Sequence, residues 1–284
     1  MRDNPKPERD RHPLEWRNPP STVTVAPRQQ PPRRPGPRLP LTPPRLTLAL
    51  LVINVAVFAL GTLLPFAGRQ FFLAGASRSY EVLVQGEVQR LFTAMFLHAS
   101  LMHLFFNMYA LYIIGRGVEG LFGHARFLLI YLLGGLTGSL LSVALGSTNP
   151  WTGVPSVGAS GAVFAIFGAE MVWLYRHRRL PGVAARRQLR SLLMVLGLNL
   201  AIGLLSSTGA GAMRIDNWAH LGGLAGGLAL AWAIGPVYRP QPHPTLVGVF
   251  QLRDGNPFSS GWWLASLYAI AWVALVVVLV TLVN

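Results

Sequence analysis

The stretch Phe127–Ala169 reads FLLIYLLGGLTGSLLSVALGSTNPWTGVPSVGASGAVFAIFGA and runs for 43 residues without a charged side chain. A helix needs about 20 apolar residues to cross a bilayer, so this stretch is too long for a single span. Proline and glycine residues between Asn149 and Gly158 interrupt it near its middle. The stretch therefore predicts two membrane-spanning helices joined by a loop, and hence a helical membrane protein.

The composition of the whole chain agrees with this class. Of 284 residues, 52% are hydrophobic and 12% are charged, whereas about 25% of the residues of a soluble domain are charged. A disordered chain is excluded because disorder requires low hydrophobicity. The chain has no cysteine, so neither a disulfide framework nor a thiolate zinc site can form.

Five further charge-free windows have the length of a span. They are Leu46–Ala67, the windows between Arg90 and Arg116, between Arg190 and Arg214 and between Asp216 and Arg239, and Trp262–Val283. We therefore predict an all-α polytopic protein with a Pro/Arg-rich disordered tail (1–45), a six-helix core (46–238), a cytoplasmic linker (239–261) and an extra C-terminal membrane helix (262–284). The connection at 68–90 is compatible with a partly embedded amphipathic helix or with a plain loop.

The basic residues predict the orientation of these spans, because Lys and Arg concentrate on the cytoplasmic side of a membrane. With the N-terminus inside, 20 of the 24 basic residues lie on the inner side. The chain is therefore expected to have a cytoplasmic N-terminus and an outer C-terminus. The tail holds ten basic residues and 13 of the 22 prolines, which predicts an unstructured arm, with contact to anionic lipid as the alternative.

Few polar side chains fall within the predicted spans, and such residues are usually functional. They are His98, His103, Asn107, Ser160, Glu170 and His220. In the predicted topology, three different helices bring four of them to one depth in the outer half of the membrane. These four are His103, Asn107, Ser160 and His220. Their shared depth predicts a single polar site.

Ser160 and His220 are candidates for a nucleophile and its general base. Ser160 follows a loop rich in proline and glycine, so we expect it at a helix N-terminus, where unpaired N–H groups stabilise a developing oxyanion. Gly223 and Gly227 share the helix face of His220 and permit a close approach to the helix that Ser160 begins. A histidine in hydrogen-bond reach of a serine can take its proton. The alternatives are a serine that caps or packs and a buried histidine bonded to a backbone carbonyl.

The remaining polar residues have less direct roles. His103 and Asn107 lie four positions apart on one helix face and can donate hydrogen bonds to an oxyanion, with bonding between helices as the alternative. We expect His98 to make a structural hydrogen bond near the interface, and we expect Glu170 near the inner surface to cap a helix or pair with an arginine. Asp216 lies at the outer end of the sixth span and is not assigned to a catalytic triad.

Other ways of activating a nucleophile do not fit this sequence. The zinc-protease motif His-Glu-x-x-His is absent, and we expect neither a metal nor another cofactor. An aspartyl dyad needs two facing carboxylates within the membrane. No aspartate lies in the middle of a span, since the chain has only Asp3, Asp10, Asp216 and Asp254. Serine chemistry with a serine–histidine dyad is the remaining option.

Four segments carry a family resemblance. They are His98–Asn107 (HASLMHLFFN), Gly115–Glu119 (GRGVE), Gly158–Gly161 (GASG) and Ala219–Gly223 (AHLGG), all within residues 87–230. With these segments the chain resembles the rhomboid intramembrane serine proteases. The resemblance implies a six-helix core with one extra C-terminal helix. It also implies Ser160 as nucleophile, His220 as base, and oxyanion donors from His103, Asn107 and the Ser160 backbone N–H.

Two positions depart from the usual pattern of that family. Gln89–Arg90 stands where rhomboids often have Trp-Arg, a change that concerns the anchoring of the first outer loop and not the chemistry. Phe164 stands one turn after the nucleophile, where Tyr is frequent, so a ring can pack on His220 without offering a hydroxyl. Supporting roles at the site are expected for Gly158, Gly161, Phe164, Gly223, Gly227 and His98.

The residues and the resemblance together predict an intramembrane serine endopeptidase that cleaves single-span membrane proteins near the outer face through an acyl-enzyme. A non-catalytic rhomboid-like protein that binds membrane helices is one alternative, but it would lack the serine or the histidine. A transporter is another, and it would show inverted repeats, which we do not find. The expected partners are transmembrane substrates and membrane lipid, with no nucleic acid, in a bacterial cytoplasmic membrane.

Overall fold

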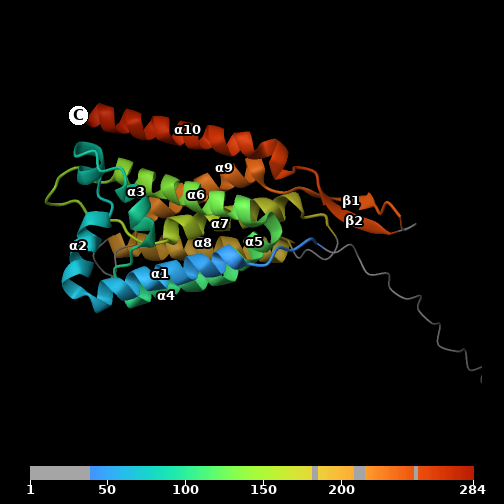
Figure 1. Cartoon of the computed structure of the whole chain (residues 1–284), viewed down its shortest axis with the longest axis horizontal. Coiled ribbons are helices and arrows are strands. Elements are labelled where there is room, and N and C mark those ends of the chain that lie inside the picture. The colour runs from blue at the N-terminus through green and yellow to red at the C-terminus, as the bar shows by residue number, and fades with distance from the viewer. Residues whose placement is uncertain (1–38, 181–184, 208–214, 246–248) are drawn as a thin grey trace, which may run out of the picture. The chain divides into compact units, whose positions relative to one another are not determined.

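The computed structural model describes residues 39–180, 185–207, 215–245 and 249–284 of the protein (Figure 1). Their α-helices are α1 (Arg45–Leu63), α2 (Pro65–Gly75), α3 (Arg90–Thr93), α4 (Leu101–Ala110), α5 (Arg116–Phe122), α6 (His124–Leu145), α7 (Ser160–Arg176), α8 (Ala185–Ser207), α9 (Asn217–Ile234) and α10 (Phe258–Val283). The described residues also form the π-helices η1 (Tyr80–Val84) and η3 (Leu111–Gly115), the 3-10 helix η2 (Ala94–Phe96), and the strands β1 (Tyr238–Pro242) and β2 (Phe250–Asp254). The predicted tail lies outside the described residues up to position 38.

Each of the seven predicted spans contains a helix, but the helices differ in length and composition. Among the described residues, α1, α6, α8 and α10 are long and apolar enough to cross a membrane, and a fifth span results if Arg90–Phe96 and Leu101–Phe122, bent by 90°, count as one. The helices α7 and α9 have 17 and 18 residues and are rich in glycine and alanine. Most side chains of α7 are buried, so other helices surround it. The predicted all-α polytopic membrane fold is confirmed.

Glycine residues bring α6, α7 and α9 into backbone contact. A Cβ atom added at Gly223 of α9 would lie 2.0 Å from the Gly161 carbonyl oxygen of α7. One added at Gly227 would lie 2.0 Å from the Ala165 oxygen, and one at Gly134 of α6 would lie 2.3 Å from the Ala165 side chain. A larger residue at any of these positions would force the helices apart, so the predicted close approach of the two helices is present.

The connection between the first and second spans is mainly helical. The first helix ends at Leu63 and not at Ala67 as predicted, because Pro65 occupies the first turn of a new helix, α2. The helix α2 and the π-helix η1 therefore replace the loop that was one of two predicted alternatives. In Figure 1, α2 and α3 lie at the end of the helix assembly opposite to the β-hairpin.

Arg90 anchors this connection although the residue before it is glutamine. Its buried guanidinium donates hydrogen bonds to the carbonyl oxygens of Leu73 (2.5 Å) and Ala76 (3.0 Å). It also pairs with the carboxylate of Glu87. Arg90 thus joins the end of α2 to the residues just before α3. The connection is therefore anchored although Gln89 replaces the tryptophan that is frequent in the family.

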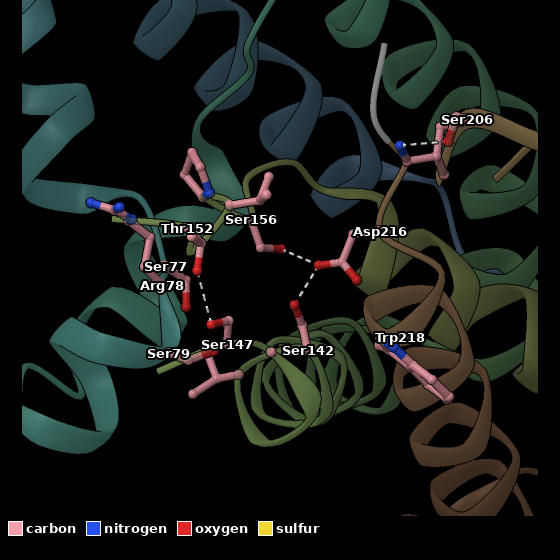
Figure 2. Close-up of a pocket in the computed structure, with 15 residues that line it drawn as sticks. Ser77, Arg78, Ser79, Ser142, Ser147, Thr152, Ser156, Ser206, Asp216 and Trp218 are labelled. Carbon is pink, nitrogen blue, oxygen red and sulfur yellow. Dashed lines mark hydrogen bonds between the residues drawn. The ribbon is translucent and has the colours of Figure 1, made fainter. Parts of the chain in front are cut away.

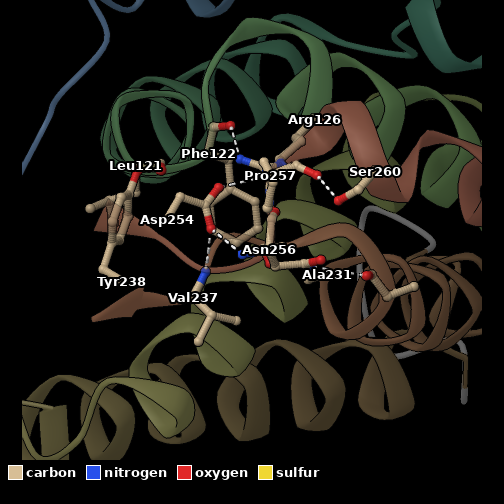
Figure 3. A network of polar contacts seen from close by, with 12 residues as sticks. Leu121, Phe122, Arg126, Ala231, Val237, Tyr238, Asp254, Asn256, Pro257 and Ser260 are labelled. Atoms are coloured by element: carbon tan, nitrogen blue, oxygen red, sulfur yellow. Dashed lines mark hydrogen bonds and ion pairs between the residues drawn. The ribbon is translucent and has the colours of Figure 1, made fainter. Parts of the chain in front are cut away.

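The segment 239–261, which we predict as a linker, contains most of a β-hairpin and the start of a helix. The strands β1 and β2 pair antiparallel, with Tyr238 opposite Asp254. The Asp254 carboxylate pairs with Arg126 of α6 at 2.8 Å and accepts from the Val237 and Asn256 N–H groups at 2.9 Å each (Figure 3). Helix α10 begins at Phe258, four residues earlier than predicted. Its first turn contains two serines and a glycine, so a search for apolar residues does not include it.

His177 links the end of α7 to this hairpin. Its buried Nε2 accepts a hydrogen bond from the Tyr238 N–H at 2.9 Å, and its Nδ1 lies 2.8 Å from the Trp173 carbonyl oxygen. These two contacts assign the proton to Nδ1 of a neutral ring. Burial lowers the pKa of His177 below its ordinary value, against the opposing effect of the Trp173 hydrogen bond. The sequence reasoning did not single out this residue.

Candidate active site

Ser160 is the first residue of α7, as predicted. The chain reaches it through Gly158, whose φ of +121° lies in a region that L side chains rarely adopt. The Gly158 N–H donates to the Ala94 carbonyl oxygen at 2.9 Å, which fixes the loop before the helix. The first N–H groups of α7 have no partner within the helix. The half-buried Ser160 hydroxyl therefore lies beside unpaired donors and the positive end of a helix dipole.

His103 and Asn107 lie against the loop that leads to Ser160. A Cβ atom at Gly158 would lie 2.6 Å from His103 Cε1, 2.7 Å from His103 Nε2 and 3.7 Å from Asn107 Nδ2. The hydroxyl of Ser100 caps α4 by accepting from the His103 N–H at 3.2 Å. The Asn107 side chain donates to the His103 carbonyl oxygen at 3.0 Å. Both predicted donors thus lie close to Gly158, which is two residues before Ser160 in the chain.

His98 lies in the same region. It is buried, and its ring packs edge-on against the His103 ring with centroids 5.2 Å apart. This contact limits the orientations that the His103 ring can adopt. Neither buried ring nitrogen of His98 has a hydrogen-bond partner among the described residues, so packing against His103 takes the place of the structural hydrogen bond that we expected.

His220 comes to the site from α9. Its ring is buried and stacks on Phe164, with centroids 4.1 Å apart and planes inclined by 9°. Phe164 lies four residues after Ser160, so both point from the same face of α7. Among the described residues, no hydrogen bond joins the Ser160 hydroxyl to the His220 ring, and the buried Nδ1 of His220 has no hydrogen-bond partner. Catalytic hydrogen bonds are often long in enzymes without substrate and tighten only in the complex.

Asp216 has a structural role beside this histidine. Its carboxylate caps α9 by accepting from the Ala219 N–H at 2.9 Å. The hydroxyls of Ser142 and Ser156 also donate to it (Figure 2). The carboxylate thus joins three parts of the chain, namely α6, α9 and the loop that precedes α7. No hydrogen bond joins it to the His220 ring among the described residues.

A polar cavity of about 270 Å³ surrounds Asp216 (Figure 2). Its hydroxyl-bearing lining residues are Ser77, Ser79, Ser142, Ser147, Thr152, Ser156 and Ser206. Ser156 also lines a smaller cavity at Ser160 and Gly158. The sequence reasoning missed this cavity, although the spacing of small polar residues at the helix ends was a usable signal. Ser156 thus borders both the cavity at Asp216 and the small space at Ser160.

Glu170 lies away from these residues. It accepts a hydrogen bond from the Gln188 side chain of α8, and not from an arginine as we expected. It therefore links two helices and has no contact with the candidate site.

These features define a multi-pass helical membrane protein in which His220 of α9 packs on α7 one turn from Ser160. A family model described as "Rhomboid domain" matches residues 85–237. The chain belongs to the rhomboid family, as the resemblance of its sequence segments implied.

Several relatives are similar to this chain. The "Rhomboid protease GluP" of Bacillus subtilis (strain 168) is 36% identical over 165 residues, which cover 57% of this chain and 29% of GluP. The "Rhomboid protease AarA" of Providencia stuartii is 31% identical over 199 residues, 63% of this chain and 68% of AarA. "RHOMBOID-like protein 1" of Arabidopsis thaliana is 33% identical over 243 residues, 75% of this chain and 57% of that protein. The matches thus span less than two thirds of GluP and of RHOMBOID-like protein 1.

Proposed function

We propose that this protein is an intramembrane serine endopeptidase with Ser160 as nucleophile and His220 as general base. The observation that carries the proposal is the backbone contact of α7 and α9 at Gly161 and Gly223, which lies beside both residues. The stacking of Phe164 on His220 gives the histidine ring a defined position next to the Ser160 turn of the helix. Two relatives bear the names of proteases, which supports the same reaction here.

In the proposed reaction, the Ser160 hydroxyl oxygen attacks the scissile carbonyl carbon while His220 takes the hydroxyl proton. The tetrahedral intermediate carries a negative oxygen. The Ser160 N–H and the side chains of His103 and Asn107 would donate to it. His220 then gives its proton to the leaving amine, and an acyl-enzyme remains. Water then attacks the ester carbonyl while His220 takes its proton. His220 returns this proton to the Ser160 oxygen as the ester bond breaks, which releases the new carboxyl end and restores the free hydroxyl.

The proposed substrates are proteins with a single membrane span, cut near the outer face. The carbonyls of a membrane helix are bonded within the helix, so the segment to be cut must unwind before Ser160 can reach one. Glycine and other small residues weaken a helix and are therefore expected near the cleaved bond. The cavity at Asp216 supports this function because its hydroxyl-bearing wall reaches Ser156, which also borders the small space at Ser160 and so offers hydrolytic water polar partners near the proposed nucleophile.

The proposed setting is a bacterial cytoplasmic membrane, with the N-terminus inside and the C-terminus outside. The distribution of Lys and Arg supports this orientation. In this arrangement residues 46–238 form the catalytic core, α10 is an additional membrane helix, and the hairpin β1–β2 lies on the cytoplasmic side. Membrane lipid surrounds the exposed apolar faces, and we propose no nucleic-acid partner.

A non-catalytic protein that binds membrane helices is the second candidate, because some relatives are named only as rhomboid-like. Labelling with a fluorophosphonate probe separates the two candidates. We expect the purified wild-type protein to form a covalent adduct at Ser160, located by mass spectrometry of its peptides. The His220→Ala variant should label at least tenfold more slowly, since it lacks the base. A wild-type protein that forms no adduct would favour the non-catalytic candidate.

A further inference from the structure

The additional helix α10 packs against the connection between the first two spans. Its Val276 is one of three buried residues in a helix of 26. Val276 belongs to a hydrophobic cluster with Val82 and Leu83 of η1 and Leu91 of α3. The partly buried Trp272, Leu279 and Val280 of α10 border the same cluster. The cluster also includes Leu140 and Val143 of α6. The C-terminal half of α10 therefore packs against η1 and α6, and shares this cluster with Leu91 of α3.

A hydrogen bond adds to this contact. The Asn284 side chain donates to the Leu83 carbonyl oxygen at 2.9 Å, across 201 positions of the chain. Further along α10, the Tyr268 hydroxyl lies 2.7 Å from the Thr137 hydroxyl of α6. The helix therefore has contacts at two levels. Near its C-terminal end, Val276 and its cluster join α10 to η1 and to α6. Nearer its start, Tyr268 joins α10 to Thr137 of α6.

The outer connection in turn holds the loop that precedes Ser160. Ser77 and Ser156 form an antiparallel bridge, with N–H to oxygen distances of 3.1 and 2.7 Å. The Ala94 carbonyl oxygen accepts from the Gly158 N–H at 2.9 Å. The loop is thus fixed at positions four and two residues before the nucleophile.

The cluster residues lie close in the chain to the residues that hold the Ser160 loop. Leu91, in the cluster with Val276, lies three residues before Ala94 in the continuous turn of α3 and η2. On the other side, Val82 donates its N–H to the Arg78 carbonyl oxygen at 3.1 Å, and Arg78 adjoins Ser77. The attachment at Ala94 is therefore three residues from Leu91 of the cluster, and the attachment at Ser77 is five residues from Val82.

We propose that α10 positions the Ser160 loop by holding η1 and α3, and that Val276 is its principal positioning residue. This inference rests on the proposed protease function. It assigns the additional helix a part in the reaction even though no residue of α10 belongs to the candidate site. Val276 acts through Ser156 and Gly158 and does not touch the reacting atoms.

The test compares two neighbouring residues of α10. Val276 is buried in the cluster, whereas Val277 is 55% exposed. The two variants Val276→Ala and Val277→Ala remove the same atoms from the same helix. We expect Val276→Ala to lower kcat for a reconstituted single-span substrate at least threefold with KM unchanged, and to slow fluorophosphonate labelling of Ser160 equally. Val277→Ala should have the kcat of the wild type. Val276→Ile, which keeps a large apolar side chain at this position, should also have wild-type kcat.

Two further variants separate positioning from general stability. Tyr268→Phe removes the hydroxyl contact with Thr137 of α6 and should lower the melting temperature without changing kcat. Val82→Ala removes the opposite side of the cluster and should lower kcat as Val276→Ala does, with a double variant no worse than the single ones. Equal kcat for Val276→Ala and Val277→Ala would overturn the inference, as would an equal fall in kcat for Tyr268→Phe. Ser160→Ala in the same assay tests the protease function separately.

Discussion

Phe164 and His220 stack face to face, with ring centroids 4.1 Å apart and planes inclined by 9°. Phe164 lies on the helix that Ser160 begins, so this contact sets the position of the histidine ring relative to the nucleophile. A hydroxyl is not needed for such stacking, which explains how phenylalanine can serve where the family often has tyrosine. The pair therefore adds to the support that the α7–α9 backbone contact gives to the proposed serine–histidine dyad.

Removing the ring tests this relationship. We expect Phe164→Ala to lower kcat about tenfold or more, because the His220 ring loses the surface that orients it and misplacement of a catalytic group is costly. Phe164→Tyr should retain wild-type kcat, since it keeps the ring. The measurement is the rate of cleavage of a single-span substrate in proteoliposomes. Wild-type kcat in Phe164→Ala would show that stacking does not position the base.

The backbone contact of α7 and α9 gives a prediction about stability. In Gly223→Ala, the new Cβ atom would lie 2.0 Å from the Gly161 carbonyl oxygen, so the helices must separate. We expect a destabilisation of about 1–3 kcal/mol or more, as for other overpacked interiors, and a loss of cleavage. The measurements are thermal unfolding and cleavage in the same detergent.

Gly197 of α8 supplies the control for this substitution, because a Cβ atom there meets nothing within 4 Å. Alanine is the better helix former by about 0.5–1 kcal/mol, so Gly197→Ala should be neutral or slightly stabilising. An unfolding temperature of Gly223→Ala equal to that of Gly197→Ala would contradict the close approach of the two helices.

Asn107 tests the proposed oxyanion donors. Truncation to alanine removes a donor that lies near Gly158, and loss of one such donor typically costs about 10²–10³-fold in kcat. We expect Asn107→Ala to show a loss of this size with little change in KM, because the donor acts on the transition state. Steady-state kinetics with one substrate provide both constants. A change confined to KM would indicate instead that Asn107 binds the substrate.

The buried His177 predicts how stability depends on pH. Its folded-state pKa lies below the ordinary value of about 6.5, so the unfolded chain binds a proton that the folded protein does not. The stability due to the neutral ring is fully present above that ordinary value. It is lost as the pH falls below it, by at most about 1.4 kcal/mol per pH unit.

The variant His177→Gln isolates this contribution, since glutamine can accept the Tyr238 hydrogen bond without titrating. We expect the melting temperature of the wild type to fall more steeply between pH 7 and about pH 5 than that of the variant. Parallel curves for the two proteins would mean that His177 does not remain neutral in the fold.

Much of the candidate site could be predicted from the sequence because charge is scarce in the predicted spans. Only a few polar residues lie within those spans, so each could be considered as a site residue. The spacing of Gly223 and Gly227 indicated which helix His220 faces. The position of Ser160 at a helix start followed from the loop residues before it. Each of these signals is local, within one or two helical turns.

The parts that sequence reasoning missed depend on contacts between distant segments. The hairpin pairs residues 238–242 with 250–254, and Arg126 of α6 holds its end through Asp254; two prolines in β1 made this segment resemble a linker. The bonds of Asp216 come from Ser142 and Ser156, which are 74 and 60 positions away. Periodicity and hydropathy within one segment carry no information about such pairings.

Cleavage of a single-span membrane protein by the purified chain in proteoliposomes tests the central claim most directly. The wild type should release a product cut near the outer face of the membrane. Ser160→Ala and His220→Ala should each reduce the rate by several orders of magnitude while remaining folded by thermal unfolding. Undiminished cleavage by folded Ser160→Ala would contradict the assignment of Ser160 as the nucleophile.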